Sequence, residues 1–108
     1  WTIMNSNNIF NEIPSDLSEE VRETLITSKN IRIERIISKG QSSQPDFWYE
    51  QEENEWVILL KGSAKLLFED GEIVELNSGD YLNIPARKKH RIDWTSPDSE
   101  TIWLAVFY

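Results

Sequence analysis

The chain has 108 residues, no cysteine and a formal net charge of −8 at pH 7. This length suits one domain with one buried core, and the absence of cysteine excludes a disulfide framework and a thiolate metal site. The acidity argues against nucleic acid as a partner, because such binding relies on lysine and arginine displacing counterions from phosphates.

No apolar run is long enough to cross a bilayer, and residues 102–108 form one of the longest. A membrane-spanning helix needs about 20 predominantly apolar residues. We therefore expect no membrane partner. A cytoplasmic location is our prediction, since nothing in the cysteine content argues for an oxidising compartment.

A helical pattern follows a tail formed by residues 1–12. In residues 13–29, Leu17, Val21 and Leu25 recur at a spacing of four behind a proline and two candidate N-cap residues. Apolar residues at this spacing lie on one face of an amphipathic helix. We predict one short N-terminal helix that covers one end of the remaining domain.

Alternation with a period of two begins after residue 29. Ile31 and Ile33 alternate with Arg32 and Glu34, which is typical of a half-buried strand. If this alternation continues, Arg35 points into the interior of the domain. A β-bulge would instead turn Arg35 outward, and the sequence leaves both interpretations open.

The centre of the chain carries a buried strand and a hairpin. Residues 56–60 are apolar at every position, so we expect both faces of this strand to be covered. Residues 64–68 and 72–76 flank Asp70 and Gly71, a dipeptide that suits a two-residue hairpin turn.

Three further strands are predicted in residues 81–84, 91–94 and 101–108. The strands are short, follow one another at intervals of about ten residues and are separated by glycine, proline, asparagine and aspartate turns. This pattern predicts an all-β antiparallel sandwich or barrel over residues 30–108.

The segment that begins at Gly79 resembles the second conserved motif of the cupin superfamily, G-x5-P-x-G-x2-H-x3-N. Gly79, Pro85 and His90 match three of its five positions. Arg87 stands in place of the second glycine, and Trp94 stands in place of the asparagine.

The first cupin motif, G-x5-H-x-H-x3,4-E-x6-G, is visible in its second half, because Glu55 and Gly62 have the required spacing. Both of its histidines are missing from the sequence. Counting back from Glu55 puts their places on one of two pairs: Trp48 and Glu50, or Tyr49 and Gln51.

Together the two motifs resemble those of small single-domain cupins. The resemblance implies an antiparallel β-barrel, also described as a double-stranded β-helix or jelly roll, and we expect one short helix before it. It also implies a homodimer, because small cupins commonly pair through strand edges that would otherwise stay bare.

In metal-bearing cupins, the histidines and glutamate of the first motif join the histidine of the second around one divalent ion. Here the resemblance leaves Glu55 and His90, with a third ligand drawn from Glu50, Gln51 or Tyr49. Such a mixed nitrogen and oxygen set would suit Mn, Fe or Zn. Without a metal, Glu55 and His90 could act as a general acid/base pair.

Two functions remain open at this point. The first is a cupin that binds a small molecule in the barrel, with or without a divalent metal, and the resemblance permits isomerases and dioxygenases. The second is a metal-free, non-catalytic binding module or sensor that recognises a ligand through Arg35, Trp48, Tyr49 and His90. The sequence names no substrate and does not decide whether the protein is an enzyme.

Overall fold

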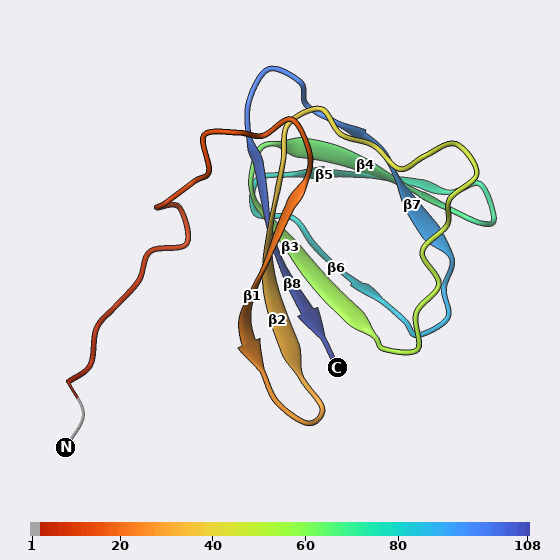
Figure 1. Cartoon of the computed structure of the whole chain (residues 1–108). Coiled ribbons are helices and arrows are strands. Elements are labelled where there is room, and N and C mark those ends of the chain that lie inside the picture. Colours follow the sequence, from red (N-terminus) through yellow and green to blue (C-terminus); the bar gives the residue numbers. More distant parts are fainter. Residues whose placement is uncertain (1–2) are drawn as a thin grey trace.

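Two antiparallel sheets make up the fold in the computed structural model, which describes residues 3–108 (Figure 1). The strands are β1 (Val21–Thr27), β2 (Arg32–Ser38), β3 (Glu55–Lys61), β4 (Ser63–Phe68), β5 (Ile73–Asn77), β6 (Tyr81–Ile84), β7 (His90–Thr95) and β8 (Thr101–Phe107). One sheet has the strand order β1-β2-β8-β3-β6, and the other has the order β5-β4-β7.

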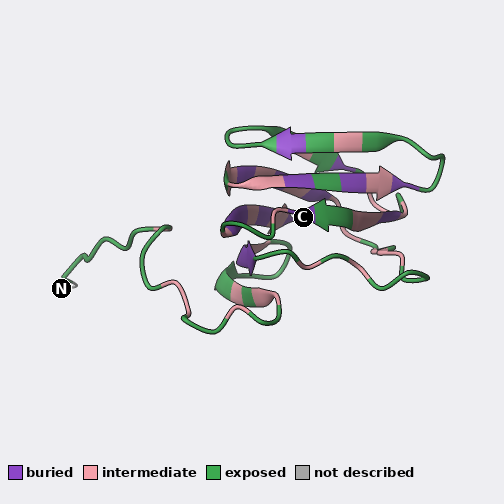
Figure 2. Cartoon of the chain, turned by 90° about the horizontal axis from the view of Figure 1, so that it is seen from above, coloured by how far each residue is buried: buried purple, intermediate pink, exposed green. Residues whose placement is uncertain are grey.

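The hydrophobic core lies between these sheets and takes side chains from both. Along β3, the inward residues are buried and the residues between them are half-buried, as the alternation of side chains along a strand requires. Figure 2 shows strands in which buried segments alternate with less buried ones. The five-stranded sheet contributes Ile36, Val57, Leu59, Ile84, Trp103, Ala105 and Phe107, and the three-stranded sheet contributes Ala64, Leu66, Phe68 and Leu76.

The all-β prediction is confirmed, but a closed barrel is not seen. Strand pairing in the larger sheet ends at β1 and β6, and pairing in the smaller sheet ends at β5 and β7. The strands therefore form two facing sheets with separate ladders of hydrogen bonds, and the core fills the space between them.

The predicted N-terminal helix is wrong. Residues 13–20 have an irregular backbone, residues 21–27 form β1, and residues 3–108 contain no helix. The segment pairs with β2 as a strand although its apolar residues have a helical spacing of four. The valine, isoleucine and threonines of β1 favour a strand. Leu25, the last residue of the supposed apolar stripe, lies at an irregularity in this pairing and is exposed. Among the described residues, no helix could cross a membrane.

The predicted hairpin between β4 and β5 is present, with a longer turn than expected. Phe68 and Glu72 close a loop of three residues, because Phe68 N donates to Glu72 O at 2.9 Å and Gly71 N donates to Phe68 O at 2.9 Å. Gly71 has a φ of 91°. A three-residue hairpin loop commonly ends on such a residue, which explains why glycine stands there and why the turn is not of the two-residue type.

Gly62 forms the tight link between β3 and β4 and has no room for a side chain. Its φ is 97°, and a Cβ built on it would lie 2.7 Å from Thr101 Cα and 2.9 Å from Glu100 O. Both neighbours are backbone atoms, which cannot move aside as a flexible side chain could. This crowding is the physical reason for the glycine that ends the first motif.

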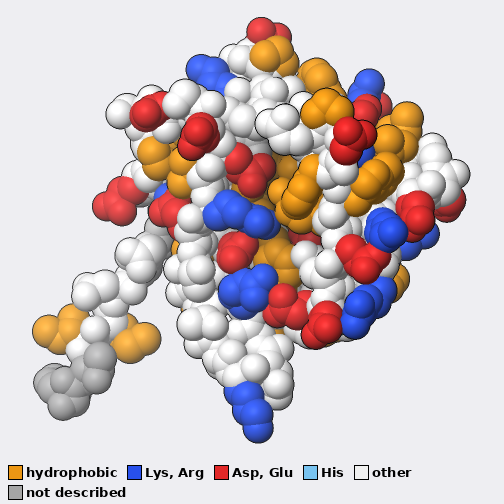
Figure 3. All heavy atoms as spheres, turned by 45° about the vertical axis from the view of Figure 1, so that its right-hand side comes forward, with side chains coloured by type: hydrophobic (Ala, Val, Ile, Leu, Met, Phe, Trp, Pro, Cys, Tyr) orange, Lys and Arg blue, Asp and Glu red, His pale blue; other side chains and the backbone are white. Residues whose placement is uncertain are grey.

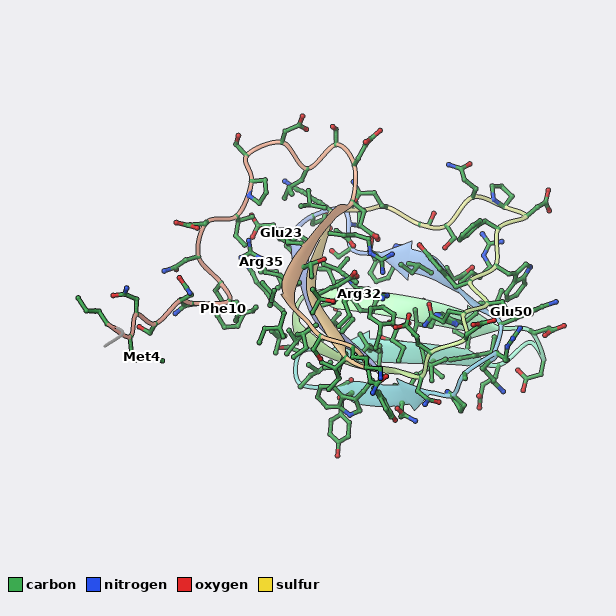
Figure 4. All side chains as sticks on the ribbon, turned by 60° about the horizontal axis from the view of Figure 1, so that its bottom comes forward. Met4, Phe10, Glu23, Arg32, Arg35 and Glu50 are labelled. Atoms are coloured by element: carbon green, nitrogen blue, oxygen red, sulfur yellow. The ribbon has the colours of Figure 1, made fainter. Side chains whose placement is uncertain are left out.

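Arg35 is buried on the outer side of β2, whereas its neighbour Ile36 belongs to the core between the sheets. Side chains therefore alternate along β2 as expected. The residues that face the core are, however, the opposite set from the one that alternation from Ile33 predicted, since Ile33 and Ile37 are outside the core cluster. The guanidinium donates to Glu23 Oε1 at 2.6 Å and to three backbone carbonyls of the N-terminal segment, those of Ile9, Asn11 and Glu12 (Figure 4). Arg35 thus holds this segment against the sheet.

Candidate functional site

A cavity of about 40 Å³ opens between the two sheets. Its apolar wall consists of Ile36, Val57, Leu66, Ile84, Ile92 and Trp103. Its polar groups belong to Glu20, Arg22, Tyr49, Gln51, Glu55 and His90. An apolar cavity into which a few polar groups converge is the usual form of a small-molecule site.

Glu55 and His90 meet in this cavity from different sheets. Glu55 begins β3, His90 begins β7, and their exposed fractions are 9% and 4%. The imidazole Nε2 lies 3.6 Å from the carboxylate Oε1. This distance suits an ion pair and is long for a hydrogen bond, so a small movement would bring the two groups into direct contact.

The backbone fixes the orientation of the His90 ring. Nδ1 lies 3.0 Å from the carbonyl oxygen of Lys88, which can only accept, so the proton must be on Nδ1. Nε2 is left facing Glu55. Burial alone would lower the pKa of His90, but the Glu55 carboxylate and the Lys88 carbonyl outweigh it and raise this pKa above 6.5.

The segment before β3 is paired with the segment before β7, and this pairing decides which side chains enter the cavity. Tyr49 N donates to His90 O at 2.7 Å, His90 N donates to Tyr49 O at 3.1 Å, and Arg87 N donates to Gln51 O at 2.8 Å. Tyr49 and Gln51 line the cavity as a result. The amide of Gln51 donates to Glu55 Oε1 at 3.0 Å, and the Tyr49 ring stacks on the His90 ring at 5.6 Å.

Trp48 and Glu50, the other pair that the motif spacing allowed, do not line the cavity. The Trp48 ring lies 5.8 Å from the Arg91 guanidinium, and the Glu50 carboxylate lies 3.6 Å from Lys89 Nζ. Figure 4 shows Glu50 on the opposite side of the molecule from the Arg35 and Glu23 pair. Arg35 does not line the cavity either, so the structure separates all three residues from Glu55 and His90.

Arg87 occupies the place of the second motif's second glycine and has a φ of 70°. A positive φ is unfavourable for a residue with a side chain, which accounts for glycine in the family pattern. The Arg87 side chain is exposed and pairs with the exposed Glu52 at 3.1 Å. This departure from the motif therefore affects the turn and leaves the cavity unchanged.

Sequence reasoning missed Glu20 and Arg22, which enter the cavity from β1 and the residue before it. Arg22 pairs with Ile36 in the register of β1 and β2, and both residues line the cavity. Arg22 Nε lies 3.5 Å from Glu34 and 3.9 Å from Glu20. The signal that could have found them was the β-branched content of residues 21–27, which indicates a strand.

Glu20 accepts one long hydrogen bond at the cavity, from Ser38 on β2. Ser38 Oγ lies 3.5 Å from Glu20 Oε2, and it accepts a hydrogen bond from Trp103 Nε1 at 3.3 Å. Burial is the main cause that raises the pKa of Glu20 above 4.5, and the nearby carboxylates of Glu34 and Glu55 add to it. Burial likewise raises the pKa of Tyr49 above 10.0, which keeps its phenol protonated at neutral pH.

The donor set does not fit a tightly bound transition-metal ion. Such sites usually have three or four protein ligands, and no group of three or more His, Cys, Asp or Glu side chains in residues 3–108 could hold an ion. Gln51 points its amide nitrogen, which cannot ligate, at Glu55. The Tyr49 phenol stays protonated, and Glu50 lies elsewhere. The predicted site of Glu55, His90 and one of these residues is therefore reduced to two ligands.

The surface carries a hollow of mixed character. Figure 3 shows hydrophobic side chains in this hollow, bordered by acidic and basic side chains. Acidic side chains predominate in the protein as a whole, with 19 aspartates and glutamates against 11 lysines and arginines.

Comparison with known proteins identifies relatives of the same architecture. A family model described as a cupin domain matches residues 34–107. A solved structure of a candidate mannose-6-phosphate isomerase from Ralstonia eutropha JMP134 is 38% identical, with a TM-score of 0.91 over 96% of this chain and 97% of that one. No curated protein matches the sequence at comparable significance.

Two more distant structures share the fold alone. A cupin superfamily protein from Desulfitobacterium hafniense DCB-2 is 21% identical, with a TM-score of 0.73 over 88% of this chain and 82% of that one. A conserved protein of unknown function from Streptococcus pyogenes is 18% identical, with a TM-score of 0.76 over 99% of this chain and 89% of that one.

Proposed function

Because this chain belongs to the cupin domain family, we propose that it binds a small polar molecule between its two sheets and moves a proton on it with Glu55 and His90. The observation that carries the proposal is the distance of 3.6 Å between Nε2 and Oε1 inside the cavity. An imidazole whose pKa is raised by a neighbouring carboxylate, as that of His90 is, can act as a general acid or base.

The Ralstonia relative suggests a class of reaction. Its name refers to a sugar-phosphate isomerase, and the isomerisation of an aldose to a ketose moves a proton between adjacent carbons. One group must remove the proton, and the same or a second group must return it. His90 is placed for this exchange, with Glu55 balancing the imidazolium that forms. We carry over the class of reaction and leave open whether the substrate is a phosphate ester. Among the residues that the structure describes, Arg22 is the one cation besides His90 that lines the cavity.

Exchange with solvent deuterium tests the proposal. Aldoses and ketoses incubated with the protein in deuterium oxide should gain deuterium at the carbon next to the carbonyl, as followed by proton NMR. His90→Gln and Glu55→Gln should each slow this exchange by about 100-fold or more, the usual contribution of a general acid or base. Lys88→Gln is the control, because only the Lys88 backbone carbonyl contacts the ring. Failure of every aldose and ketose to exchange would remove the catalytic proposal.

A non-catalytic binding module is the second candidate. The observation in its favour is that Tyr49 and Gln51 occupy the cavity positions where the motif has two histidines. An aromatic ring and an amide recognise a ligand by stacking and hydrogen bonding and do not transfer protons. Under this alternative, a ligand should bind without exchange, and Tyr49→Leu should weaken its binding more than Glu55→Gln does.

A further inference from the structure

The cavity is too small for a whole substrate. Its volume of about 40 Å³ corresponds to a few water molecules, because one water occupies about 10–15 Å³ on the same measure. A sugar or a compound of similar size therefore cannot be enclosed. Only a small end group can enter, and the remainder of a larger ligand must lie outside.

A groove beside the cavity offers that space. It has a volume of about 460 Å³ and shares Glu20, Tyr49 and Ile92 with the cavity, so the two spaces adjoin at these residues. The volume lies in the range of small-molecule sites, about 300–1,000 Å³. Phe47 extends the aromatic wall, and its ring stands perpendicular to that of Tyr49 at 4.8 Å.

The charges around this path favour a positive group. The groove is lined by Glu19 and Glu20, and its lining contains no lysine, arginine or histidine among the described residues. Inside, Arg22 is shared between Glu20 and Glu34, and His90 is next to Glu55. Glu34 does not line the cavity and is also paired with Arg32, at 3.0 Å. The linings of the cavity and the groove thus contribute three carboxylates, those of Glu19, Glu20 and Glu55, against the guanidinium of Arg22 and the imidazole of His90. Two negative charges remain when the imidazole is neutral, and one remains when it is protonated.

This surplus matters because the groups are partly removed from water. A carboxylate away from water is stabilised by a cation or by several hydrogen bonds. Within residues 3–108, Glu20 has Arg22 at 3.9 Å and one long hydrogen bond, from Ser38 Oγ at 3.5 Å. The rings of Phe47 and Tyr49 add faces that attract cations.

We infer that the site takes a ligand with a small, positively charged end group such as a protonated amine, and that it rejects anionic groups. The amine would pass Tyr49 and pair with Glu20, beside the Glu55 and His90 pair, while the body of the ligand lies in the groove. This inference rests on the proposed function in so far as it concerns the same cavity. It goes further by naming the charge of the ligand.

Three small probes of similar size test the inference: propylammonium, 1-propanol and acetate, each titrated at constant ionic strength into nitrogen-15-labelled protein. The amide signals of Glu20, Tyr49 and Gln51 should shift saturably with propylammonium. Binding of propanol should be at least about tenfold weaker, the usual effect of losing a hydrogen bond to a charged group. Acetate should cause no saturable shift.

Variants separate a local effect from the overall acidity of the protein. Glu20→Gln should weaken propylammonium binding by about tenfold. Glu75→Gln makes the same change of charge at an exposed position of β5 and should leave binding unaltered. Arg22→Gln should strengthen binding, because it removes the cation that competes for Glu20.

The inference is overturned if acetate binds as tightly as propylammonium, if propylammonium causes no saturable shift, or if both glutamate variants weaken it equally. These results differ from failure of the proposed function. Acetate binding that is lost in His90→Gln would remove the charge preference and leave a proton-transfer site. Propylammonium binding in a protein that exchanges no proton would remove catalysis and leave the charge preference.

Discussion

The imidazole of His90 lies 3.6 Å from the carboxylate of Glu55, although the two residues begin strands of different sheets. Phe68 pairs with His90 in the smaller sheet, and Ile84 pairs with Glu55 in the larger one. Both partners are buried core residues. The position of the pair is therefore set by the packing of one sheet on the other, and any change in that packing should alter its chemistry.

The first prediction concerns pH. Because the folded pKa of His90 is raised above its unfolded value near 6.5, its protonated form stabilises the fold. This contribution is fully present below pH 6.5 and is lost as the pH rises through the folded pKa. The free energy of unfolding, measured by urea denaturation across this range, should fall with rising pH. His90→Gln should flatten that decline.

Glu55 is the charged group that raises the pKa of His90, and Glu20 and Arg22 line the same cavity. Glu55→Gln should therefore flatten the same decline by removing the partner. Glu75→Gln, at an exposed position, should leave it in place. An unchanged slope in His90→Gln would mean that another group titrates.

The second prediction concerns metal content. Protein purified without chelators should contain well under one Mn, Fe or Zn ion per chain by elemental analysis, because Glu55 and His90 are the two ligands in place. His90→Gln should have the same metal content as the wild-type chain. A stoichiometric ion that disappears in His90→Gln would show instead that the metal-dependent interpretation of the sequence is right.

The third prediction compares two glycines with similar backbone angles. Gly62 and Gly71 have φ values of 97° and 91°, but a Cβ at Gly62 would meet backbone atoms whereas one at Gly71 would meet nothing within 4 Å. Gly71→Ala should cost about 1–2 kcal/mol, the usual penalty of a positive φ. Gly62→Ala should cost clearly more, because Thr101 must move. Equal losses in thermal or urea unfolding would contradict the crowding at Gly62.

The fourth prediction concerns assembly. We propose a homodimer that pairs through β1, an edge strand of the larger sheet with exposed Leu25 and Ile26. Light scattering should give twice the mass of one chain for the wild type and the mass of one chain for Ile26→Glu. Ile73→Glu is the matched control, since Ile73 lies on the edge strand β5 of the other sheet and both isoleucines are 57% exposed. A monomeric wild type would remove the proposal, and loss of the dimer in Ile73→Glu alone would move it to the other edge.

Local patterns predicted the strands well where the pattern and the burial agree. The apolar run in residues 56–60 became the central part of β3, and the dipeptide Asp70-Gly71 became the β4–β5 turn. The helix in residues 13–29 failed because leucine and valine at a spacing of four satisfy a helix and a strand with an irregularity equally well. Pairing with β2 decided between helix and strand, and the sequence of residues 13–29 does not specify that pairing.

The motif spacing left two pairs of residues as candidates for the cavity. The hydrogen bonds that Tyr49 makes with His90 decided between them, because a strand turns alternate side chains to opposite faces. Tyr49 and Gln51 therefore face Glu55, while Trp48 and Glu50 face away. The orientation of Arg35 stayed open in the sequence for a related reason, since the alternation in β2 shows two faces without showing which one is covered by the other sheet.

By itself the sequence determined the class of fold, the positions of most strands and the two residues, Glu55 and His90, that the motifs point to. These features depend on the period of the side chains and on turn residues, which are local properties of the chain. Only the tertiary structure brought Glu20 and Arg22 into the same cavity and excluded Arg35. Contacts between residues far apart in sequence depend on how the sheets pack, and no local pattern encodes that packing.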